Sequence, residues 1–241
     1  MYDVRFYKGN YRWRQAQANR DKCIAYIEHH FNSTGSTTIG YAVTVVGYNS
    51  SGTSKAWGRW YANHIGQEFR IPVSGQGGIA IGGFNGRGNG NVKHTNMPAI
   101  LLEPMFVSNP SQAKIVRSEE GQNKLAKILA DSIVEFFPKG GKIAFSVGHK
   151  YKTSRPRDRG AAVHGGGAEA DYAEIVLEKA KHILENYKEA PPKPIMEEDD
   201  AVDNEIRVIK NGKEIWSNSE LDEDDEVLWD EENRTLYLNT E

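Results

Sequence analysis

The sequence excludes several kinds of protein through what it lacks. It contains a single cysteine, Cys23, so no disulfide can form within the chain, and its apolar surroundings favour a buried structural thiol. No apolar run approaches the roughly 20 residues that a transmembrane helix needs. The first residues, MYDVRFYKGNYRWR, have no apolar signal-peptide core. We therefore expect a protein without stable membrane association that is cytoplasmic in the cell that makes it.

Two compact functional motifs are also missing. The Gly-rich residues 74–91 include GFNGRG, but no Lys-Ser or Lys-Thr pair follows, which argues against a phosphate-binding loop. There is no His-Glu-x-x-His run, in which one helix supplies two zinc ligands. Any metal ligands in this chain must therefore come from separate segments.

Charge is divided unevenly along the 241 residues. Residues 195–241 carry 17 acidic and four basic side chains, a net charge of −13. Because the whole chain has a net charge of −3, residues 1–194 carry +10. A basic body suits a polyanionic target such as a cell wall or a nucleic acid, whereas the acidic part could equally be a solubilising surface.

A Pro-rich and then acidic stretch divides the chain. The long helical pattern stops before residues 191–204, and the proline and acidic composition of these residues is typical of a linker. Residues 1–190 are long enough for one well-cored domain. Residues 205–241 alternate apolar and polar positions around Asn211-Gly212, which predicts a hairpin followed by one or two strands. This small acidic β module could bind the wall, pack on the body, or pair edge strands between copies to form a homo-oligomer.

Apolar runs alternate with helical patterns in the first domain. Strands are expected at CIAYIEHH (23–30), GYAVTVVGY (40–48), PAILLEPMF (98–106) and KIAFSVGH (142–149). Helical spacing covers residues 54–69, 119–137 and 169–187. Together these patterns predict an α/β fold, with a mostly parallel or mixed twisted sheet and helices on both of its faces.

Polar residues close several of the apolar strands. Side chains alternate along a strand, so Glu28 and His30 share one face while His29 points to the other. His30 also stands at the strand's carboxyl end, where ligands bind in α/β sheets, and is therefore preferred over His29. His149 ends another strand in the same way. Glu103 ends a third, where a carboxylate is costly unless it is paired, bound to metal or catalytic.

One more carboxylate, Glu169, stands in the first turn of a predicted helix after a triple-glycine turn. Two imidazoles and a carboxylate with an open fourth position form a known catalytic Zn²⁺ arrangement. His164, in AVHGGG, is an alternative to Glu169 as a ligand. On spacing alone the assignment stays open, because His30 and His149 are also compatible with ordinary polar residues at strand ends.

Three segments together resemble the zinc-dependent N-acetylmuramoyl-L-alanine amidases, the AmiC-like amidase-3 family. GHKYKTSRPRDRGAAVHGGGAEAD resembles the family's strand ending in Gly-His and the Glu that follows it. RQAQANRDKCIAYIEHHFNS resembles its Arg-x-x-x-Ala-Asn stretch and its strand ending in His-x-Asn. PAILLEPMFVSNP resembles its strand ending in Glu before Phe-x-Ser-Asn-Pro.

The resemblance implies a function and a set of site residues. It implies that His30, His149 and Glu169 bind Zn²⁺ and that Glu103 is the catalytic carboxylate. The implied reaction is hydrolysis of the amide between N-acetylmuramic acid and L-alanine in bacterial peptidoglycan, so the partner is peptidoglycan and not nucleic acid. Without an export signal, such an enzyme is expected to be a phage endolysin that lyses the cell wall after its release.

The segments occur in a different order from that of the family. The family's second half, residues 2–137, comes first, and its opening unit, residues 142–188, follows through FFPKGGKIAF. This order predicts a circularly permuted domain, which is physically reasonable because domain termini often lie close together. The basic loop Lys150–Arg159 is longer than in the family. The residues expected to bind substrate are Asn32, Arg155, Arg157 and Arg159.

Two other functions stay open on the sequence. One keeps the zinc ion and cleaves a peptide bond, as a peptidoglycan peptidase would. The other uses the fold without catalysis, as a cell-wall-binding module.

Overall fold

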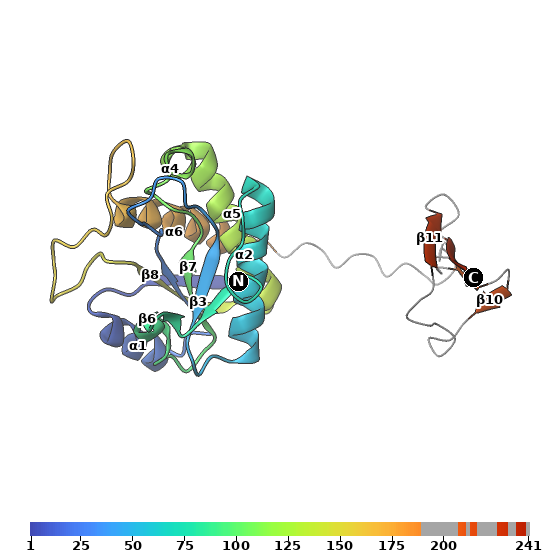
Figure 1. Cartoon of the computed structure of the whole chain (residues 1–241). Coiled ribbons are helices and arrows are strands. Elements are labelled where there is room, and N and C mark those ends of the chain that lie inside the picture. Colours follow the sequence, from blue (N-terminus) through green and yellow to red (C-terminus); the bar gives the residue numbers. More distant parts are fainter. Residues whose placement is uncertain (189–206, 211–212, 216–225, 231–234, 240–241) are drawn as a thin grey trace. The chain divides into compact units, whose positions relative to one another are not determined.

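The computed structural model describes residues 1–188, 207–210, 213–215, 226–230 and 235–239 (Figure 1). The chain forms two compact units, Met1–Glu189 and Ala190–Glu241. The expected linker, residues 191–204, lies outside the described residues. No helix within the described residues has the length and apolar character that crossing a bilayer requires.

Strands and helices alternate through most of the first unit. Its strands are β1 (Tyr2–Phe6), β2 (Ala25–His29), β3 (Val43–Val46), β4 (Ile79–Ile81), β5 (Gly83–Phe84), β6 (Arg87–Gly88), β7 (Ala99–Glu103) and β8 (Gly141–Val147). Its helices are α1 (Tyr11–Arg20), α2 (Gly52–Phe69), α3 (Asn89–Val92), α4 (Pro110–Arg117), α5 (Glu119–Phe136) and α6 (Glu169–Glu185).

Six of these strands form one mixed sheet in the order β1-β8-β2-β7-β3-β4. β1, β8, β2 and β7 run parallel, whereas β3 runs antiparallel to β7. Although β8 is the last strand of the first unit along the chain, it lies between β1 and β2 in the sheet. The carboxyl ends of β8, β2 and β7 are therefore neighbours at one edge of the sheet, which is where ligands bind in α/β proteins.

Apolar side chains pack on both faces of the sheet. Alternation along β2 puts Ala25 and Ile27 into the larger core, which the apolar sides of α2, α4, α5 and α6 complete. Tyr26 points the other way, into a smaller core that contains Ala18 of α1 and Val92 of α3. The predicted α/β fold with a mixed sheet and helices on both faces is confirmed (Figure 1).

Local capping explains where several helices start. The side chain of Ser51 accepts a hydrogen bond from the Ser54 amide at the start of α2, and Ser118 does the same for Gly121 at the start of α5. The Gly-rich residues 74–91 contain β4, β5, β6 and most of α3. These elements are too short to show a periodic pattern in sequence.

The two ends of the first unit lie together. The ring of Tyr187, just after α6, meets the ring of Tyr2 edge-on at a centroid distance of 5.9 Å. Nζ of Lys181 in α6 donates to the Val4 carbonyl of β1 at 2.8 Å. The end of α6 and the start of β1 are therefore neighbours in space, although α5 and not α6 leads into β8 along the chain.

The second unit contains a four-stranded sheet in the order β10-β9-β12-β11. Its strands are β9 (Arg207–Lys210), β10 (Lys213–Ile215), β11 (Glu226–Asp230) and β12 (Thr235–Asn239). β9 pairs antiparallel with β10, as the predicted hairpin requires, and β12 joins β9 in parallel. The predicted small β module is confirmed; the turn at Asn211-Gly212 lies outside the described residues.

Candidate metal centre

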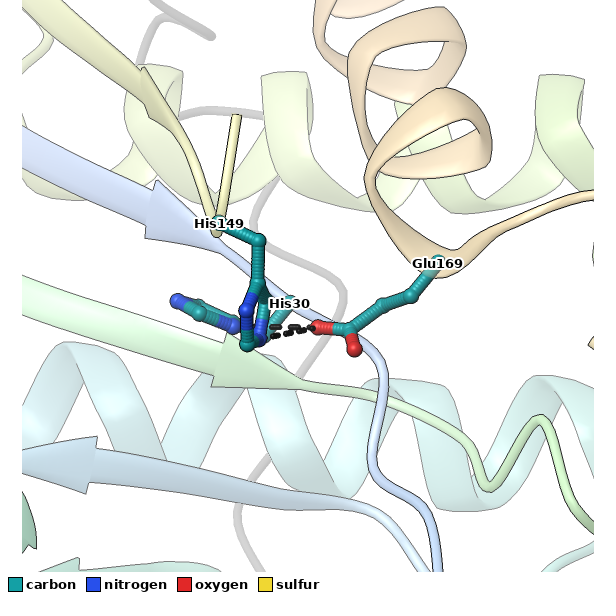
Figure 2. Close-up of side chains that lie close together, drawn as sticks. All are labelled: His30, His149 and Glu169. Atoms are coloured by element: carbon teal, nitrogen blue, oxygen red, sulfur yellow. Dashed lines mark hydrogen bonds and ion pairs between the residues drawn. The ribbon is translucent and has the colours of Figure 1, made fainter. Parts of the chain in front are cut away.

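Three side chains from different parts of the first unit converge at the carboxyl edge of the sheet (Figure 2). His30 follows β2, His149 follows β8 and Glu169 begins α6. Nδ1 of His30 lies 3.0 Å from Oε1 of Glu169, and Nε2 of His149 lies 3.4 Å from the same oxygen. One ligand atom from each residue falls within 4.8 Å of the others. His29 points away from this cluster, as expected, because its side chain packs against Phe31 in the larger core.

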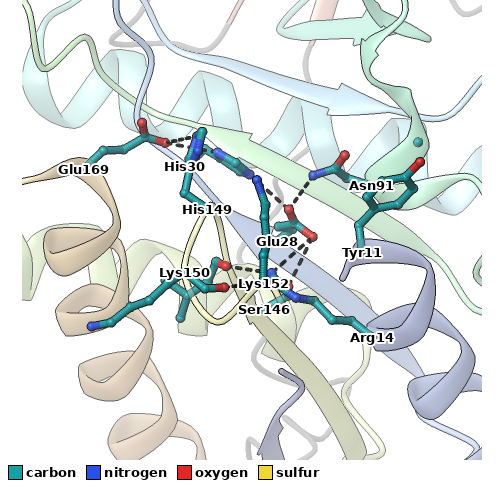
Figure 3. A network of polar contacts seen from close by, with 12 residues as sticks. Tyr11, Arg14, Glu28, His30, Asn91, Ser146, His149, Lys150, Lys152 and Glu169 are labelled. Carbon is teal, nitrogen blue, oxygen red and sulfur yellow. Dashed lines mark hydrogen bonds and ion pairs between the residues drawn. The ribbon is translucent and has the colours of Figure 1, made fainter. Parts of the chain in front are cut away.

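A buried polar network orients His30 (Figure 3). Nε2 of His30 lies 3.1 Å from Oε1 of Glu28, which is fully buried on the same face of β2. Glu28 also accepts hydrogen bonds from Tyr26 and Ser146, each at 3.1 Å, and from Asn91. Because Glu28 holds Nε2, the Nδ1 atom of His30 is the one that faces the cluster.

The charge state of His30 reflects these two carboxylates. Burial lowers the pKa of His30, but its hydrogen bonds with Glu169 and Glu28 outweigh burial and raise the pKa to about 10. Without a metal ion, the imidazolium therefore donates one N–H to each carboxylate. A divalent cation at Nδ1 would take the place of that proton.

A carboxylate also orients His149, but through Nδ1 and not through Nε2 as in His30. Nδ1 of His149 lies 3.0 Å from Oδ1 of Asp158, so that Nε2 faces the cluster. Although burial raises it, hydrogen bonds from the Gly160 amide, Lys152 and His149 lower the pKa of Asp158 to about 2. His149 has a left-handed backbone with φ of 60°, a conformation that is uncommon outside glycine. This backbone turn directs the imidazole away from the line of β8 and into the cluster.

Glu169 is fixed by hydrogen bonds to both of its oxygens. Oε2 accepts from the Ala161 amide at 2.9 Å, and Oε1 accepts from the Phe31 amide at 3.3 Å. Although burial raises it, hydrogen bonds from His149 and His30 bring the pKa of Glu169 well below its ordinary value. The carboxylate is therefore charged and preorganised.

Glu103, the last residue of β7, lies in the same cavity with an unsatisfied oxygen. The cavity has a volume of about 590 Å³ and is lined by Glu103 together with His30, His149 and Glu169. Within the described structure, Oε2 of Glu103 is buried and has no hydrogen-bond partner. Burial raises the pKa of Glu103 to about 7, against an opposing effect of His30. A buried carboxyl with a near-neutral pKa is suited to accept and return a proton.

Two glycines make room for the cluster. A Cβ atom at Gly148 would overlap the imidazole of His30, and one at Gly160 would overlap the Glu169 carboxylate and the His149 ring. Gly160 also has a φ of +74°, which side chains rarely adopt. The backbone is thus shaped around these three side chains.

The donor set fits a divalent metal ion. Two imidazole nitrogens and a carboxylate oxygen point at a common place, and each imidazole is held from behind by a carboxylate, Glu28 or Asp158. Carboxylate–histidine pairs of this kind fix the ring orientation at metal sites. The unsatisfied oxygen of Glu103 in the same cavity leaves room for a further polar group.

Of the other expected site residues, one lines the cavity and the rest do not. Asn32 lines the cavity. Arg155 lines a neighbouring hollow, and Arg159 forms an ion pair with Asp171. Arg157 lines neither space and is exposed. The alternative ligand His164 is also exposed and lies outside the His30–His149–Glu169 cluster.

Several residues of the site were not singled out from the sequence. The sequence did contain a signal for Glu28, which is an acidic residue in an apolar strand on the same face as His30. No sequence signal marked Asp158 as a site residue, because it lies among basic residues in a loop. Arg14 was expected from the resemblance, as the arginine of the Arg-x-x-x-Ala-Asn stretch, but without a role; it donates to the Ser146 hydroxyl and the Val147 carbonyl, each at 2.7 Å, and so ties α1 to the end of β8. Such partners become visible only once the fold brings them together.

The sequence can be compared with known families once this geometry is clear. The Amidase_3 model, described as N-acetylmuramoyl-L-alanine amidase, matches residues 5–135, which is more than half of the chain. The chain belongs to the amidase-3 family. The match includes His30 and Glu103 and ends before His149 and Glu169. No curated protein sequence matches the chain.

Several solved amidase structures are similar to parts of this amidase-3 protein. The catalytic domain of CwlV from Bacillus (Paenibacillus) polymyxa var. colistinus is 26% identical, with 54% of this chain and 66% of that chain covered and a TM-score of 0.44. An N-acetylmuramoyl-L-alanine amidase from Clostridium difficile 630 is 18% identical, with the same coverage and a TM-score of 0.46. Ami1 from Mycobacterium smegmatis is 21% identical, with coverage of 53% and 60% and a TM-score of 0.46. The chain thus covers less than two thirds of these proteins.

Proposed function

We propose that this protein hydrolyses the amide between the lactyl group of N-acetylmuramic acid and L-alanine in peptidoglycan, with Zn²⁺ as its metal. The observation that carries the proposal is the convergence of His30, His149 and Glu169 beside the unsatisfied carboxyl of Glu103, in a chain of the amidase-3 family. Imidazole nitrogen with carboxylate oxygen suits zinc better than it suits calcium or magnesium.

The residues of the centre have separate roles in this proposal. His30, through Nδ1, His149, through Nε2, and Glu169 hold the ion. When bound, zinc supplies a Lewis acid that polarises a carbonyl and lowers the pKa of water. Glu28 and Asp158 keep the two imidazoles in the required orientation.

Glu103 is the proton carrier of the reaction. Its carboxylate accepts a proton from the attacking water, and the resulting carboxylic acid donates that proton to the departing amine of L-alanine. The C–N bond breaks as the new C–O bond is completed, so the products are a lactyl carboxyl group and a free amino terminus. In the metal-free protein, the buried position of Glu103 raises its pKa to about 7, and this environment favours a carboxyl that both accepts and returns a proton.

We also propose that the domain is a circular permutation of the family's usual order. The contact between Tyr2 and Tyr187 and the bond from Lys181 to Val4 support this view, because they bring the end of α6 to the start of β1. In the family's order the chain would run directly from one to the other. The break lies at that junction instead, and α5 continues into β8.

Product analysis on purified muropeptides tests the function. The expected products are a stem peptide with a free L-alanine amino terminus and a muramic acid with a free lactyl carboxyl, with activity lost in chelator and restored by zinc. His30→Ala should lose both bound zinc and activity. Peptide-internal cuts alone would indicate a peptidase, and wall binding that is unchanged by chelator without any cleavage would indicate a binding module.

The cellular setting is part of the proposal and has its own test. If the protein is an endolysin that acts from the cytoplasm after release, cells that express the full chain should stay intact until their membrane is permeabilised and should then lyse. Lysis of expressing cells without permeabilisation would contradict this setting.

A further inference from the structure

A second hollow adjoins the metal-centre cavity. It has a volume of about 810 Å³ and lies between the start of α1 and the loop that follows β8. Lys152 lines both this hollow and the cavity that contains Glu103 and the metal ligands. A substrate bound at the metal centre could therefore extend directly into the hollow.

The walls of the hollow are tied together by tertiary hydrogen bonds. The Gly9 amide donates to the Tyr151 carbonyl at 3.0 Å, and the Ser154 amide and hydroxyl both donate to Oδ1 of Asn10, at 3.2 and 2.8 Å. The Arg14 side chain donates to the Lys150 carbonyl (Figure 3). These bonds dock the loop on the first turn of α1, so the hollow is a built feature of the fold.

The side chains that line the hollow are cationic and aromatic. Arg12 and Arg155 are exposed, and neither guanidinium has a hydrogen-bond or ion-pair partner within the described residues. None of the described residues that line the hollow is acidic. Trp13 is 58% exposed and Tyr11 is 38% exposed, although large aromatic side chains are usually covered. Unpaired cations beside bare aromatic surface are typical of a site that binds an anionic, partly apolar ligand.

We infer that this hollow binds the acidic stem peptide of the substrate on the L-alanine side of the scissile amide. This inference rests on the proposed function. In a glycan–peptide substrate cut at that amide, the lactyl carboxyl of the sugar is blocked, so the free carboxylates belong to the peptide. Because the hollow offers the two unpaired guanidinium groups of Arg12 and Arg155, charge complementarity favours the peptide over the glycan strand. Lys152 adds no free charge, since its Nζ pairs with Asp158 at 3.0 Å.

The lining residues divide the recognition between charge and apolar contact. Arg12 and Arg155 bind peptide carboxylates, for which guanidinium groups are suited by their fork of N–H donors. Trp13 supplies an apolar surface for the methylene and methyl groups of the peptide. Replacing an arginine should therefore weaken binding only of peptides that carry the carboxylate, whereas replacing Trp13 should weaken binding of all of them.

Calorimetric titration of two matched peptides into the zinc-loaded full chain tests this division. The probes are L-Ala-γ-D-Glu-L-Lys with its C-terminal carboxyl amidated, and the same peptide with the α-carboxylate of its D-Glu residue also converted to an amide. Neither contains the scissile bond. The wild type should bind the acid form about three- to tenfold more tightly than the amide form, and added salt should reduce the difference.

Variants then assign the effect to residues. Arg12→Ala/Arg155→Ala should bind both peptides equally, at the affinity of the amide form, and Arg155→Ala alone should lose part of the preference. Trp13→Ala should weaken both peptides by a similar factor. Arg20→Ala is the matched control, since Arg20 is an exposed arginine of α1 outside the hollow, and it should bind as the wild type does.

The outcomes separate this inference from the proposed function. Peptide binding that is unchanged in the folded Arg12→Ala/Arg155→Ala and Trp13→Ala variants overturns the inference even if the amidase reaction occurs. Loss of binding in these variants supports it even if no amide is cleaved. Binding of a peptide-free N-acetylglucosamine–N-acetylmuramic acid disaccharide that is lost in Trp13→Ala, without any peptide binding, would assign the hollow to the glycan and overturn it.

Discussion

Nδ1 of His149 lies 3.0 Å from Oδ1 of Asp158, so a loop residue fixes the ring of a strand-end histidine. Because an orienting carboxylate strengthens a metal-bound imidazole, Asp158→Asn should weaken zinc binding by about 10- to 100-fold. Competition with a chromophoric chelator measures this change. Asp131→Asn is the control, because Asp131 is a surface carboxylate of α5 that pairs only with Lys127 among the described residues. Equal zinc affinity in the two variants would contradict a role for Asp158.

Glu103→Gln separates metal binding from proton transfer. Since Glu103 lies in the cavity but outside the three-ligand cluster, zinc content should stay at that of the wild type. Turnover should fall by about 10²- to 10⁴-fold, because glutamine cannot carry the proton. Metal analysis and release of L-alanine amino termini measure the two quantities on one preparation. Loss of zinc together with activity would instead make Glu103 a part of the metal site.

The same residue should make the stability of the metal-free protein depend on pH. Burial raises the pKa of Glu103 from 4.5 to about 7, so the folded state binds its proton more tightly than the unfolded state does. This contribution is fully present below pH 4.5 and is lost as the pH rises through about 7. The free energy of unfolding of the wild type, relative to Glu103→Gln, should therefore fall by about 3 kcal/mol across this range. Urea titrations at several pH values measure it, and parallel curves for the two proteins would refute it.

Gly148 should not tolerate a side chain. A Cβ at this position would overlap the His30 imidazole, so Gly148→Ala should displace a ligand and lower zinc affinity, with a loss of about 1–3 kcal/mol in stability from overpacking. Gly52→Ala is the matched control, because a Cβ at Gly52 meets no atom within 4 Å. Zinc titration and thermal unfolding of both variants measure the difference.

The proposed permutation can be reversed. A chain that begins at Lys139, runs to Lys188, continues through a short Gly-Ser linker into Tyr2 and ends at Pro138 should fold and bind one zinc ion. The reason is that the end of α6 already lies beside β1. Circular dichroism and metal stoichiometry measure the result, and an unfolded or zinc-free product would count against the proposed order.

The first unit should also be sufficient for the chemistry. His30, Glu103, His149 and Glu169 all lie within Met1–Glu189, which is compact in itself. A chain that ends at Glu189 should therefore cleave small soluble muropeptides with a kcat/KM within about twofold of the full chain, because it keeps every residue to which the chemistry is assigned. A large loss would mean that residues 190–241 take part in the reaction.

The parts of the site that follow local rules could be predicted from the sequence. Alternation along a strand separated His30 from His29, and the cost of burying a carboxylate marked Glu103 at the end of β7. The sheet order could not be predicted in this way, because nothing local shows that β8 lies between β1 and β2. The ligand cluster depends on that order, and without the family resemblance its members stayed separate candidates.

Other features arise only from tertiary contacts. The polar sequence of α1 has no apolar stripe, and its position depends on the bonds of Arg14 to the end of β8. Asp158 and the hollow beside Trp13 both depend on how the loop after His149 docks against that helix. Such loop conformations are set by long-range hydrogen bonds, which composition and periodicity do not report.

His30 and Glu169 are 139 positions apart in the chain, yet they meet across a single hydrogen bond. An ion held by both would clasp an early strand to the last helix of the domain, and so would resist unfolding as well as promote chemistry. At a free zinc concentration of a thousand times Kd, zinc binding would raise the free energy of unfolding of the domain by about 4 kcal/mol. Sequestering zinc would then weaken the whole domain, and a protease could remove the enzyme wherever the metal is scarce.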